Sequence, residues 1–312
     1  MKHLFIVNPV AGTQKPEDKL RLIHEAMNRL PTSMRARDEF EIYVTSAPMD
    51  AVGRIRSAAA ACRELRVYAC GGDGTLNECV NGAAGLANTA VTHFPCGTGN
   101  DFIRMFENEK SRFYDLTELM TGEVRPLDVI KCNDRYAINI CSLGIDARVG
   151  TDVHKYSGLP VVGGAAGYVV SLAVNYVKGV KQAMTAVTEG LTCGPELNLV
   201  CVCNGRYYGG GFNPTNDARP DDGVMDVLIA SGVNRAKLLG VIMSYAKGRY
   251  KHYPQYITCV RTTHLEVKCR NTEVINIDGE AEHSTTAVFD LIPGGVNFIV
   301  PKDMKFFREK RS

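Results

Sequence analysis

The sequence predicts a mixed fold, with an α/β domain at the N-terminus and a C-terminal domain built mainly of antiparallel sheet. In the first third, short apolar runs alternate with segments of helical spacing, the pattern of a mostly parallel sheet covered by helices. After about Leu127, strand-like runs separated by Gly, Asn and Asp turns replace that pattern. A chain of 312 residues that is 45% hydrophobic can also bury two separate cores.

The N-terminal elements follow from the spacing of apolar side chains. Leu20, Ile23, Met27 and Leu30 recur at helical intervals, whereas short apolar runs that end at turn residues indicate buried strands. The expected strands are residues 4–7, 40–45, 66–70 and 91–95, and the expected helices are residues 16–30, 48–65, 75–84 and 100–106.

The C-terminal elements are mostly strands. They are expected at residues 129–132, 135–141, 196–203, 224–231, 264–268 and 273–277, with a helix around residues 167–180. We therefore predict an α/β domain over residues 1–127, completed by residues 296–312, and an antiparallel β-sandwich over residues 128–295.

The composition favours some classes of protein over others. Lys plus Arg number 36 and Asp plus Glu 34, so no strongly basic face is expected and no nucleic-acid partner is predicted. The 11 cysteines form no C-x-x-C pair, which indicates buried thiols in a reducing compartment rather than a zinc site or disulfide framework. A cytoplasmic location is therefore expected.

Membrane insertion is not expected from the apolar segments. The N-terminal apolar stretch is too short for a signal peptide and is better interpreted as a first strand. Residues 156–177 carry no charge, but they include several glycines and Pro160, so only their second half could form an apolar helix. We expect attachment at a membrane surface at most.

A glycine-rich turn carries the first chemical signal. Residues 71–75, Gly-Gly-Asp-Gly-Thr, follow a buried strand and open a helix. Glycines let the backbone N–H groups approach a phosphate, and a helix N-terminus favours an anion. Asp73 requires a cation, water or hydroxyl between itself and a phosphate, so it is a candidate for Mg²⁺ linkage or proton handling. A capped strand-to-helix turn is the simpler alternative.

Two further turns favour a nucleotide site. Residues 96–101 again pass from a strand through glycines into a helix, and residues 8–12 follow the first strand. Turns after parallel strands converge on one edge of the sheet, where such folds bind ligands. The sequence contains no Gly-Lys dipeptide and no H-R-D or D-F-G motif, which excludes a P-loop NTPase and a typical protein kinase.

These motifs together resemble the diacylglycerol kinase catalytic domain. They are Asn-Pro-x-Ala-Gly at residues 8–12, Gly-Gly-Asp-Gly-Thr at residues 71–75 with Glu78, Asn81 and Gly82, and Pro-x-Gly-Thr-x-Asn-Asp-Phe at residues 95–102. The resemblance continues through residues 204–211, 220–223 and 278–280 and is greatest to the stand-alone bacterial YegS-like lipid kinases. It implies a Rossmann-like first domain of the phosphofructokinase and NAD kinase type.

The resemblance implies an ATP- and Mg²⁺-dependent lipid kinase, most simply one that converts diacylglycerol to phosphatidic acid. The residues that would contact ATP are Asn8, Pro9, Val10, Ala11, Gly12, Thr45, Gly71, Gly72, Asp73, Gly74, Thr75, Leu76, Asn77, Thr98 and Glu280. Asp73, Asp278 and Glu280 would be catalytic. The proton acceptor lies in residues 278–280 by resemblance, with Asp278 slightly favoured; an Asp-Gly hairpin turn is the alternative for this triplet.

The resemblance also implies a structural Mg²⁺ at Asp222 with the carbonyls of Arg219 and Val224. The acyl chains require an apolar cleft, for which Tyr207, Tyr208, Phe212 and residues 156–177 are candidates. The basic tail, residues 302–311, is either a transient membrane contact or a final packed end.

Two other functions and the assembly state stay open. A kinase of a soluble metabolite such as NAD would share the fold, and a non-catalytic nucleotide or lipid sensor would share the turns. Residues 95–101 lack the Asn-x-Gly-x-x-Gly-Phe loop of NAD kinases, which favours the lipid kinase. A homodimer is compatible with exposed sheet edges.

Overall fold

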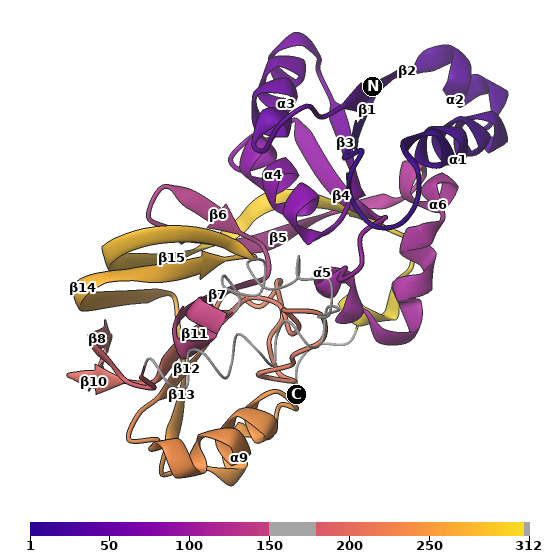
Figure 1. Cartoon of the computed structure of the whole chain (residues 1–312). Coiled ribbons are helices and arrows are strands. Elements are labelled where there is room, and N and C mark those ends of the chain that lie inside the picture. The colour runs from indigo at the N-terminus through magenta and orange to yellow at the C-terminus, as the bar shows by residue number, and fades with distance from the viewer. Residues whose placement is uncertain (150–178, 309–312) are drawn as a thin grey trace. The chain divides into compact units, whose positions relative to one another are not determined.

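The computed structural model describes residues 1–149 and 179–308. The chain divides into two compact units, Met1–Asp128 with Pro293–Ser312 and Val129–Ile292. Figure 1 shows the helices and strands of both units. The helix predicted around residues 167–180 lies almost wholly outside the described residues, as do residues 156–177.

The first unit is an α/β layer. Its elements are β1 (Lys2–Val7), α1 (Pro16–Arg29), α2 (Thr32–Arg37), β2 (Glu39–Val44), α3 (Asp50–Ala61), β3 (Leu65–Gly71), α4 (Asp73–Ala83), β4 (Thr89–Pro95), α5 (Asp101–Arg104), η1 (Glu107–Tyr114), α6 (Leu116–Met120), β5 (Glu123–Cys132) and η3 (Lys305–Phe307). Strands β2, β1, β3 and β4 are parallel neighbours in that order. The end of β15 (Glu280–Val300) pairs in parallel with β4. Figure 1 shows α3 and α4 on one side of these strands and α1 and α6 on the other.

Burial explains the parallel strands. Every residue of β4 is buried, as are Leu4, Phe5, Ile6 and Val7 of β1, because helices cover both faces of such a sheet. The α1 helix begins at Pro16, where a missing N–H costs nothing, with Glu17 and Asp18 in its positively polarised first turn.

The second unit is antiparallel throughout its described pairs. It contains β6 (Arg135–Ala137), β7 (Ile140–Gly144), β8 (Gln182–Thr188), β9 (Leu191–Cys193), β10 (Glu196–Leu197), β11 (Leu199–Cys203), β12 (Met225–Ala230), α9 (Arg235–Tyr245), η2 (Tyr250–His252), β13 (Ile257–Thr262), β14 (His264–Ile277) and the first part of β15. The neighbours run β13, β12, β11, β7 and β14, and β14 also pairs with β8 and β15. The predicted fold class is confirmed.

Strand β11 has apolar side chains on both of its faces. Val200 and Val202 join one buried cluster, whereas Cys201 and Cys203 join a second cluster that also contains Leu238 of α9. Alternate residues of a strand point to opposite faces, so a strand between two cores has a continuous apolar sequence. All eleven cysteines are free thiols, as expected.

The structure differs from the sequence predictions at several elements. The strands predicted at residues 135–141 and 196–203 are each divided into two, and α2, α6, β8, β9, β13 and β15 have no predicted counterpart. Three further differences concern β14, α5 and α9. The strands predicted at residues 264–268 and 273–277 are one strand, β14, with an irregularity in its pairing between Lys268 and Glu273. The predicted helix 100–106 shortens to α5, followed by the 3₁₀ helix η1. Helix α9 was not predicted, because Leu238, Leu239, Val241, Ile242 and Met243 are spread around the helix and give no single apolar stripe.

Candidate active site

The predicted turns lie at one edge of the parallel sheet. The last strand residues Val7 and Val44 are paired, and Gly71 is paired with Pro95. Val7 also pairs with Cys70, one residue before the end of β3. The residues that follow these strand ends, Asn8, Thr45, Gly72 and Cys96, therefore share the edge where ligands bind in open α/β sheets.

Glycine contacts show how closely the three turns approach. A Cβ atom on Gly12 would lie 1.9 Å from the Cys96 carbonyl oxygen, and one on Gly97 would lie 2.5 Å from Gly72 Cα. Neither position can hold a side chain without moving backbone. The turns at residues 8–12, 71–75 and 96–101 thus meet, as the sequence predicts.

Side chains cross-link the same turns. The Asn8 amide donates to Thr75 Oγ1 at 3.1 Å. Asp73, in the first turn of α4, accepts at Oδ1 from the backbone N–H groups of Asp101 at 2.7 Å and Phe102 at 3.3 Å. Burial raises the pKa of Asp73, although these N–H donors act in the opposite direction by stabilising the carboxylate.

Lys19 holds the first turn from below. It is fully buried on α1, and its ammonium donates to the carbonyl oxygens of Asn8 at 2.8 Å and Ala11 at 2.6 Å. Because both carbonyl oxygens accept from the Lys19 ammonium, the turn is held in one conformation. Sequence analysis missed this residue; its only signal was a lysine beside the apolar positions Leu20 and Ile23.

His93 supports the second turn from the neighbouring strand. It is fully buried on β4, and its Nε2 lies 3.1 Å from the Gly71 carbonyl oxygen. Burial lowers the pKa of His93 to about 4, so the ring is neutral at physiological pH and Nε2 carries the proton that it donates.

The other predicted ATP residues differ in what they offer a ligand. Thr45 follows β2 beside Asn8, and its backbone N–H donates to the Val7 carbonyl at 3.0 Å. Thr98 is exposed and Val10 is 86% exposed, so both side chains are open to a ligand. Leu76 and Asn77 are buried, and the Leu76 backbone N–H donates to the Gly72 carbonyl oxygen at 3.1 Å, so these residues support the turn from within. Pro9, Ala11 and Gly74 are half-buried within the same turns.

The acidic triplet of residues 278–280 is a hairpin turn in the second unit. Ile277 of β14 pairs with Glu280 of β15, and Asp278 and Gly279 between them have φ of 51° and 97°. Two positive φ values are the requirement of a type I′ hairpin. The hairpin interpretation is therefore correct for the backbone.

The two carboxylates of this turn have different surroundings. Asp278 folds back and accepts from the backbone N–H groups of Ile138, Asn139 and Ile140 at 2.8, 3.0 and 2.9 Å. Glu280 is exposed, and among the described residues its side chain has no hydrogen-bond or ion-pair partner. Asp278 thus fixes a loop, whereas Glu280 is available to a substrate.

The turn predicted to hold a structural Mg²⁺ already contains a cation. Asp222 Oδ2 lies 2.6 Å from Arg261 Nη2, and its Oδ1 accepts weakly from the Val224 N–H at 3.4 Å. Arg219 donates from Nε and Nη2 to the two carboxylate oxygens of Asp221. No group of three or more His, Cys, Asp or Glu side chains suited to a metal occurs in the described part of the chain. A guanidinium beside Asp222 repels a second cation, so these residues fit Mg²⁺ poorly and we assign no step to an ion here.

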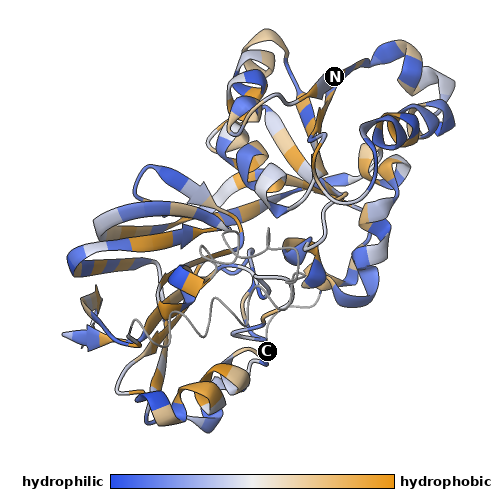
Figure 2. Cartoon of the chain, in the orientation of Figure 1, coloured by the Kyte–Doolittle hydropathy of each residue, from blue (hydrophilic) through white to orange (hydrophobic). Residues whose placement is uncertain are grey.

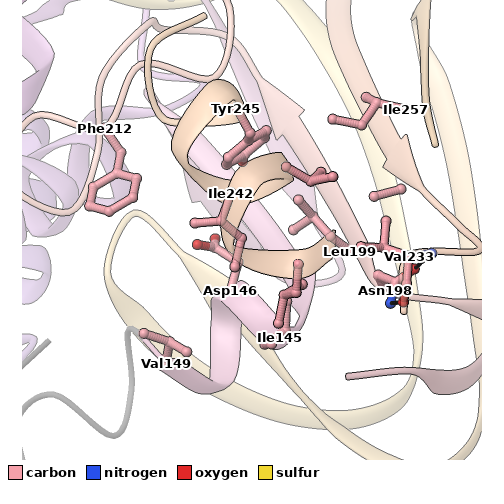
Figure 3. Close-up of a pocket in the computed structure, with 13 residues that line it drawn as sticks. Ile145, Asp146, Val149, Asn198, Leu199, Phe212, Val233, Ile242, Tyr245 and Ile257 are labelled. Atoms are coloured by element: carbon pink, nitrogen blue, oxygen red, sulfur yellow. Dashed lines mark hydrogen bonds between the residues drawn. The ribbon is translucent and has the colours of Figure 1, made fainter. Parts of the chain in front are cut away.

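An apolar cavity lies inside the second unit, with an empty volume, its mouth included, of about 490 Å³. Figure 3 shows its lining side chains, which come from the helical turn 145–149, strand β11, α9 and the loop at Phe212. Among the predicted lipid contacts, Phe212 lines this cavity and Tyr208 packs against Phe212 with ring centroids 5.9 Å apart. Its apolar lining is typical of a site for an apolar ligand.

One carboxylate interrupts the apolar wall. Asp146 lines the cavity and accepts from the Tyr208 hydroxyl at 2.6 Å, and that hydroxyl lies 3.1 Å from the hydroxyl of Tyr245. Burial raises the pKa of Asp146, while the Tyr208 hydrogen bond counteracts part of that effect. Asp146 was not among the predicted site residues, although a carboxylate directly after the mainly apolar run Ile140–Ile145 was a visible signal.

The basic C-terminal tail is packed over the residues that the structure describes. Phe306 and Phe307 contact Phe106, with ring centroids 4.9 and 5.8 Å apart, and Arg308 pairs with Asp303. These contacts favour the packed end over a membrane contact for this segment.

Comparison with known proteins agrees with this geometry. The family model for the diacylglycerol kinase catalytic domain matches residues 2–132, and that for the YegS C-terminal NAD kinase beta sandwich-like domain matches residues 139–300. The chain therefore belongs to the diacylglycerol kinase family with a YegS-type C-terminal domain, and it is a lipid kinase.

Particular relatives are bacterial. A Staphylococcus carnosus protein named "Putative lipid kinase" is 25% identical over 246 residues, which cover 78% of this chain and 74% of the relative. A Bacillus anthracis structure described as a diacylglycerol kinase superposes with a TM-score of 0.69 at 21% identity, over 97% of this chain and 98% of the other. A second structure from that organism gives a TM-score of 0.73 at 23% identity over the same shares. The structures support the shared fold.

Proposed function

We propose that the protein transfers the γ-phosphoryl group of ATP to the hydroxyl of diacylglycerol and forms phosphatidic acid. The observation that carries the ATP part is the meeting of three glycine turns at one sheet edge, where Gly12, Gly72 and Gly97 let the backbones of the turns pack against one another. Phosphoryl transfer depends mainly on such positioning and on charge neutralisation.

Mg²⁺ fits this rim better than it fits Asp222. Mg²⁺ commonly uses one or two carboxylates, keeps several waters and binds substrate phosphates, so it does not require a three-residue cluster. Asp73 would hold it, directly or through water, and the ion would neutralise phosphate charge. The three predicted turns would hold the nucleotide, with Lys19 fixing the first of them.

Glu280 is our proposed proton acceptor. The family resemblance slightly favours Asp278, but three backbone N–H donors occupy the Asp278 carboxylate. A general base must reach the hydroxyl proton of its substrate, and an exposed carboxylate has that freedom. We assign Asp278 to positioning, because it ties residues 138–140 to the hairpin that carries Glu280.

The apolar cavity of the second unit supports a lipid acceptor. Its lining would bury an acyl chain, and the Asp146 and Tyr208 pair would hydrogen-bond a polar group of the lipid. Because ATP is dissolved and the acceptor is in a bilayer, the reaction requires transient contact with a membrane surface. No helix in the described part of the chain is both long and apolar enough to cross a membrane.

The decisive experiment is a kinase assay with γ-labelled ATP, with and without Mg²⁺. The acceptors are diacylglycerol, monoacylglycerol, phosphatidylglycerol, a sphingoid base and NAD. We expect the wild-type protein to form labelled phosphatidic acid. The variants Asp146→Asn and Tyr208→Phe should each have a roughly tenfold higher KM for diacylglycerol and an unchanged KM for ATP. Preference for another lipid would change the assigned acceptor. Phosphorylation of NAD alone, or ATP binding without any transfer, would reject the proposal.

A further inference from the structure

Helix α9 has two apolar faces, and only one of them is covered. Leu238, Val241 and Tyr245 are buried and line the cavity. On the opposite side, Leu239 is 63% exposed and Met243 is 51% exposed. These two residues are four apart, so they are adjacent on the helix surface. The outer face therefore presents an apolar pair directly above a cavity wall.

Cations without acidic neighbours surround this pair in the sequence. From Val227 to Leu265 the chain contains no Asp or Glu. The same stretch holds an exposed group of five basic residues along α9 and the turn after it: Arg235, Lys237, Lys247, Arg249 and Lys251. Figure 2 shows α9 as a mainly apolar ribbon with hydrophilic positions among its residues.

Contacts from neighbouring elements neutralise little of the charge on Lys237, Lys247, Arg249 and Lys251. Lys251 lies 3.5 Å from Asp217, a long and exposed pair, and Lys237 donates to the Tyr256 hydroxyl at 2.7 Å. Within residues 1–149 and 179–308, neither Lys247 nor Arg249 has an ion-pair partner. The surface consequently attracts an anionic partner.

The arrangement of charge and apolar area distinguishes between anionic partners. Arg235 lies one helical turn before Leu239 on α9, and Lys247 and Arg249 follow the end of the helix, so cations precede and follow the apolar pair along the chain. At a bilayer the apolar side chains enter the acyl boundary while the cations stay beside lipid phosphates. A nucleic acid would leave Leu239 and Met243 in water.

We propose that residues 234–256, the α9 surface, dock on an anionic lipid bilayer and present the cavity behind α9 to the lipid. Tyr253 and Tyr256, both half-buried, suit the interface because an aromatic ring with a hydroxyl prefers the headgroup level. This inference rests on the proposed function, since it names the surface through which a lipid kinase reaches its acceptor.

Vesicle cosedimentation tests the proposal. The full chain is mixed with vesicles of phosphatidylcholine, with or without phosphatidylglycerol, at low and physiological salt. We expect binding only with phosphatidylglycerol. Lys247→Glu with Arg249→Glu should weaken it by more than roughly thirtyfold, because the loss of two cations near an anionic surface accounts for about that factor and the new carboxylates add repulsion. Leu239→Ser with Met243→Ser should weaken it by roughly tenfold.

The matched control is Lys110→Glu with Arg270→Glu, two exposed cations outside the α9 surface that make the same change in net charge. Thermal unfolding checks that every variant folds. If this control loses vesicle binding to the same extent, the loss is explained by net charge alone and the proposal is overturned. A different outcome would be a wild-type protein that binds RNA and not vesicles. If Leu239→Ser with Met243→Ser leaves that RNA binding unchanged, the surface would be assigned to a polyanion instead.

A kinase assay on short-chain diacylglycerol in detergent micelles separates the two proposals. The α9 surface variants should keep wild-type activity there and lose it on vesicles. If the wild type phosphorylates no lipid yet binds anionic vesicles through α9, the function fails and the docking surface stands. If the enzyme is active and the variants bind vesicles like the wild type, the docking surface is rejected and the function stands.

Discussion

The Asp73 carboxylate accepts the backbone N–H of Asp101 at 2.7 Å and so joins the second glycine turn to the third. The two residues are 28 positions apart in sequence, and their contact closes the phosphate rim at the ends of β3 and β4. A charged acceptor makes such a bond strong, and it also places negative charge where a cation bound to ATP would need it.

Asp73→Asn separates these two contributions. The amide keeps an oxygen acceptor for Asp101 but removes the charge, so we expect kcat to fall about a hundredfold or more with little change in thermal midpoint. Steady-state kinetics with diacylglycerol micelles measure the effect. Asp73→Ala should lose both activity and stability; a fully active Asp73→Asn would show that the charge has no part in transfer.

Replacing Lys19 with methionine should loosen the first turn. The carbonyls of Asn8 and Ala11 would lose their shared donor, at a cost of about 1–3 kcal/mol in unfolding free energy. We expect a higher KM for ATP from a less ordered turn, measured with the KM for lipid as the internal reference. Lys15→Met, at an exposed position just before α1, is the matched control and should leave both constants unchanged.

The hairpin turn at Asp278 and Glu280 gives a prediction in which two neighbouring carboxylates behave differently. Glu280→Gln should lower kcat by about 10²–10⁴-fold with unchanged stability, as for loss of a general base. Asp278→Asn should lower the free energy of unfolding, because a neutral amide accepts three backbone N–H groups less well.

Kinetics and denaturant unfolding of both variants provide the comparison. A Glu280→Gln enzyme with normal kcat, beside an inactive but stable Asp278→Asn enzyme, would return the base to Asp278.

Two buried histidines predict an acid-sensitive fold. Burial lowers the pKa of His3 and of His93 from 6.5 to about 4 in the folded protein. The unfolded chain therefore binds more protons between these values, and stability falls as pH is lowered from about 6.5 to 4. Each histidine accounts for a loss of at most about 3 kcal/mol over that range.

The neighbouring carboxylates act in other ways. Arg37 holds the pKa of Asp38 down at about 2, so the stability from Asp38 is lost only at pH below 3.8. The raised pKa of Asp73 has the opposite effect on stability, because the folded protein binds this proton more readily than the unfolded chain. It therefore offsets part of the stability that the histidines lose as the pH falls. Denaturant unfolding between pH 4 and 7 measures the slope, which His93→Gln should reduce; an unchanged slope would mean that His93 is protonated in the native state.

Three features could be predicted from the sequence: the alternation of β1–β4 with their helices, the β-rich second unit and the phosphate turns. Short-range sequence patterns are sufficient to predict these features, because glycine positions, apolar periodicity and strand ends can each be recognised within about ten residues. Sequence also placed Asp278 and Glu280 in one turn, but it had no means of separating their roles.

Which polar groups already have hydrogen-bond or ion-pair partners could not be predicted, because those partners are distant in sequence. The backbone N–H groups that bind Asp278 come from residues about 140 positions earlier, and the guanidinium beside Asp222 comes from Arg261. Lys19, His93 and Asp146 acquired their places in the same way, through burial and partners that long-range packing supplies. A carboxylate becomes a base, a clamp or half of an ion pair according to the donors that the fold brings to it, and those donors are not neighbours in the chain.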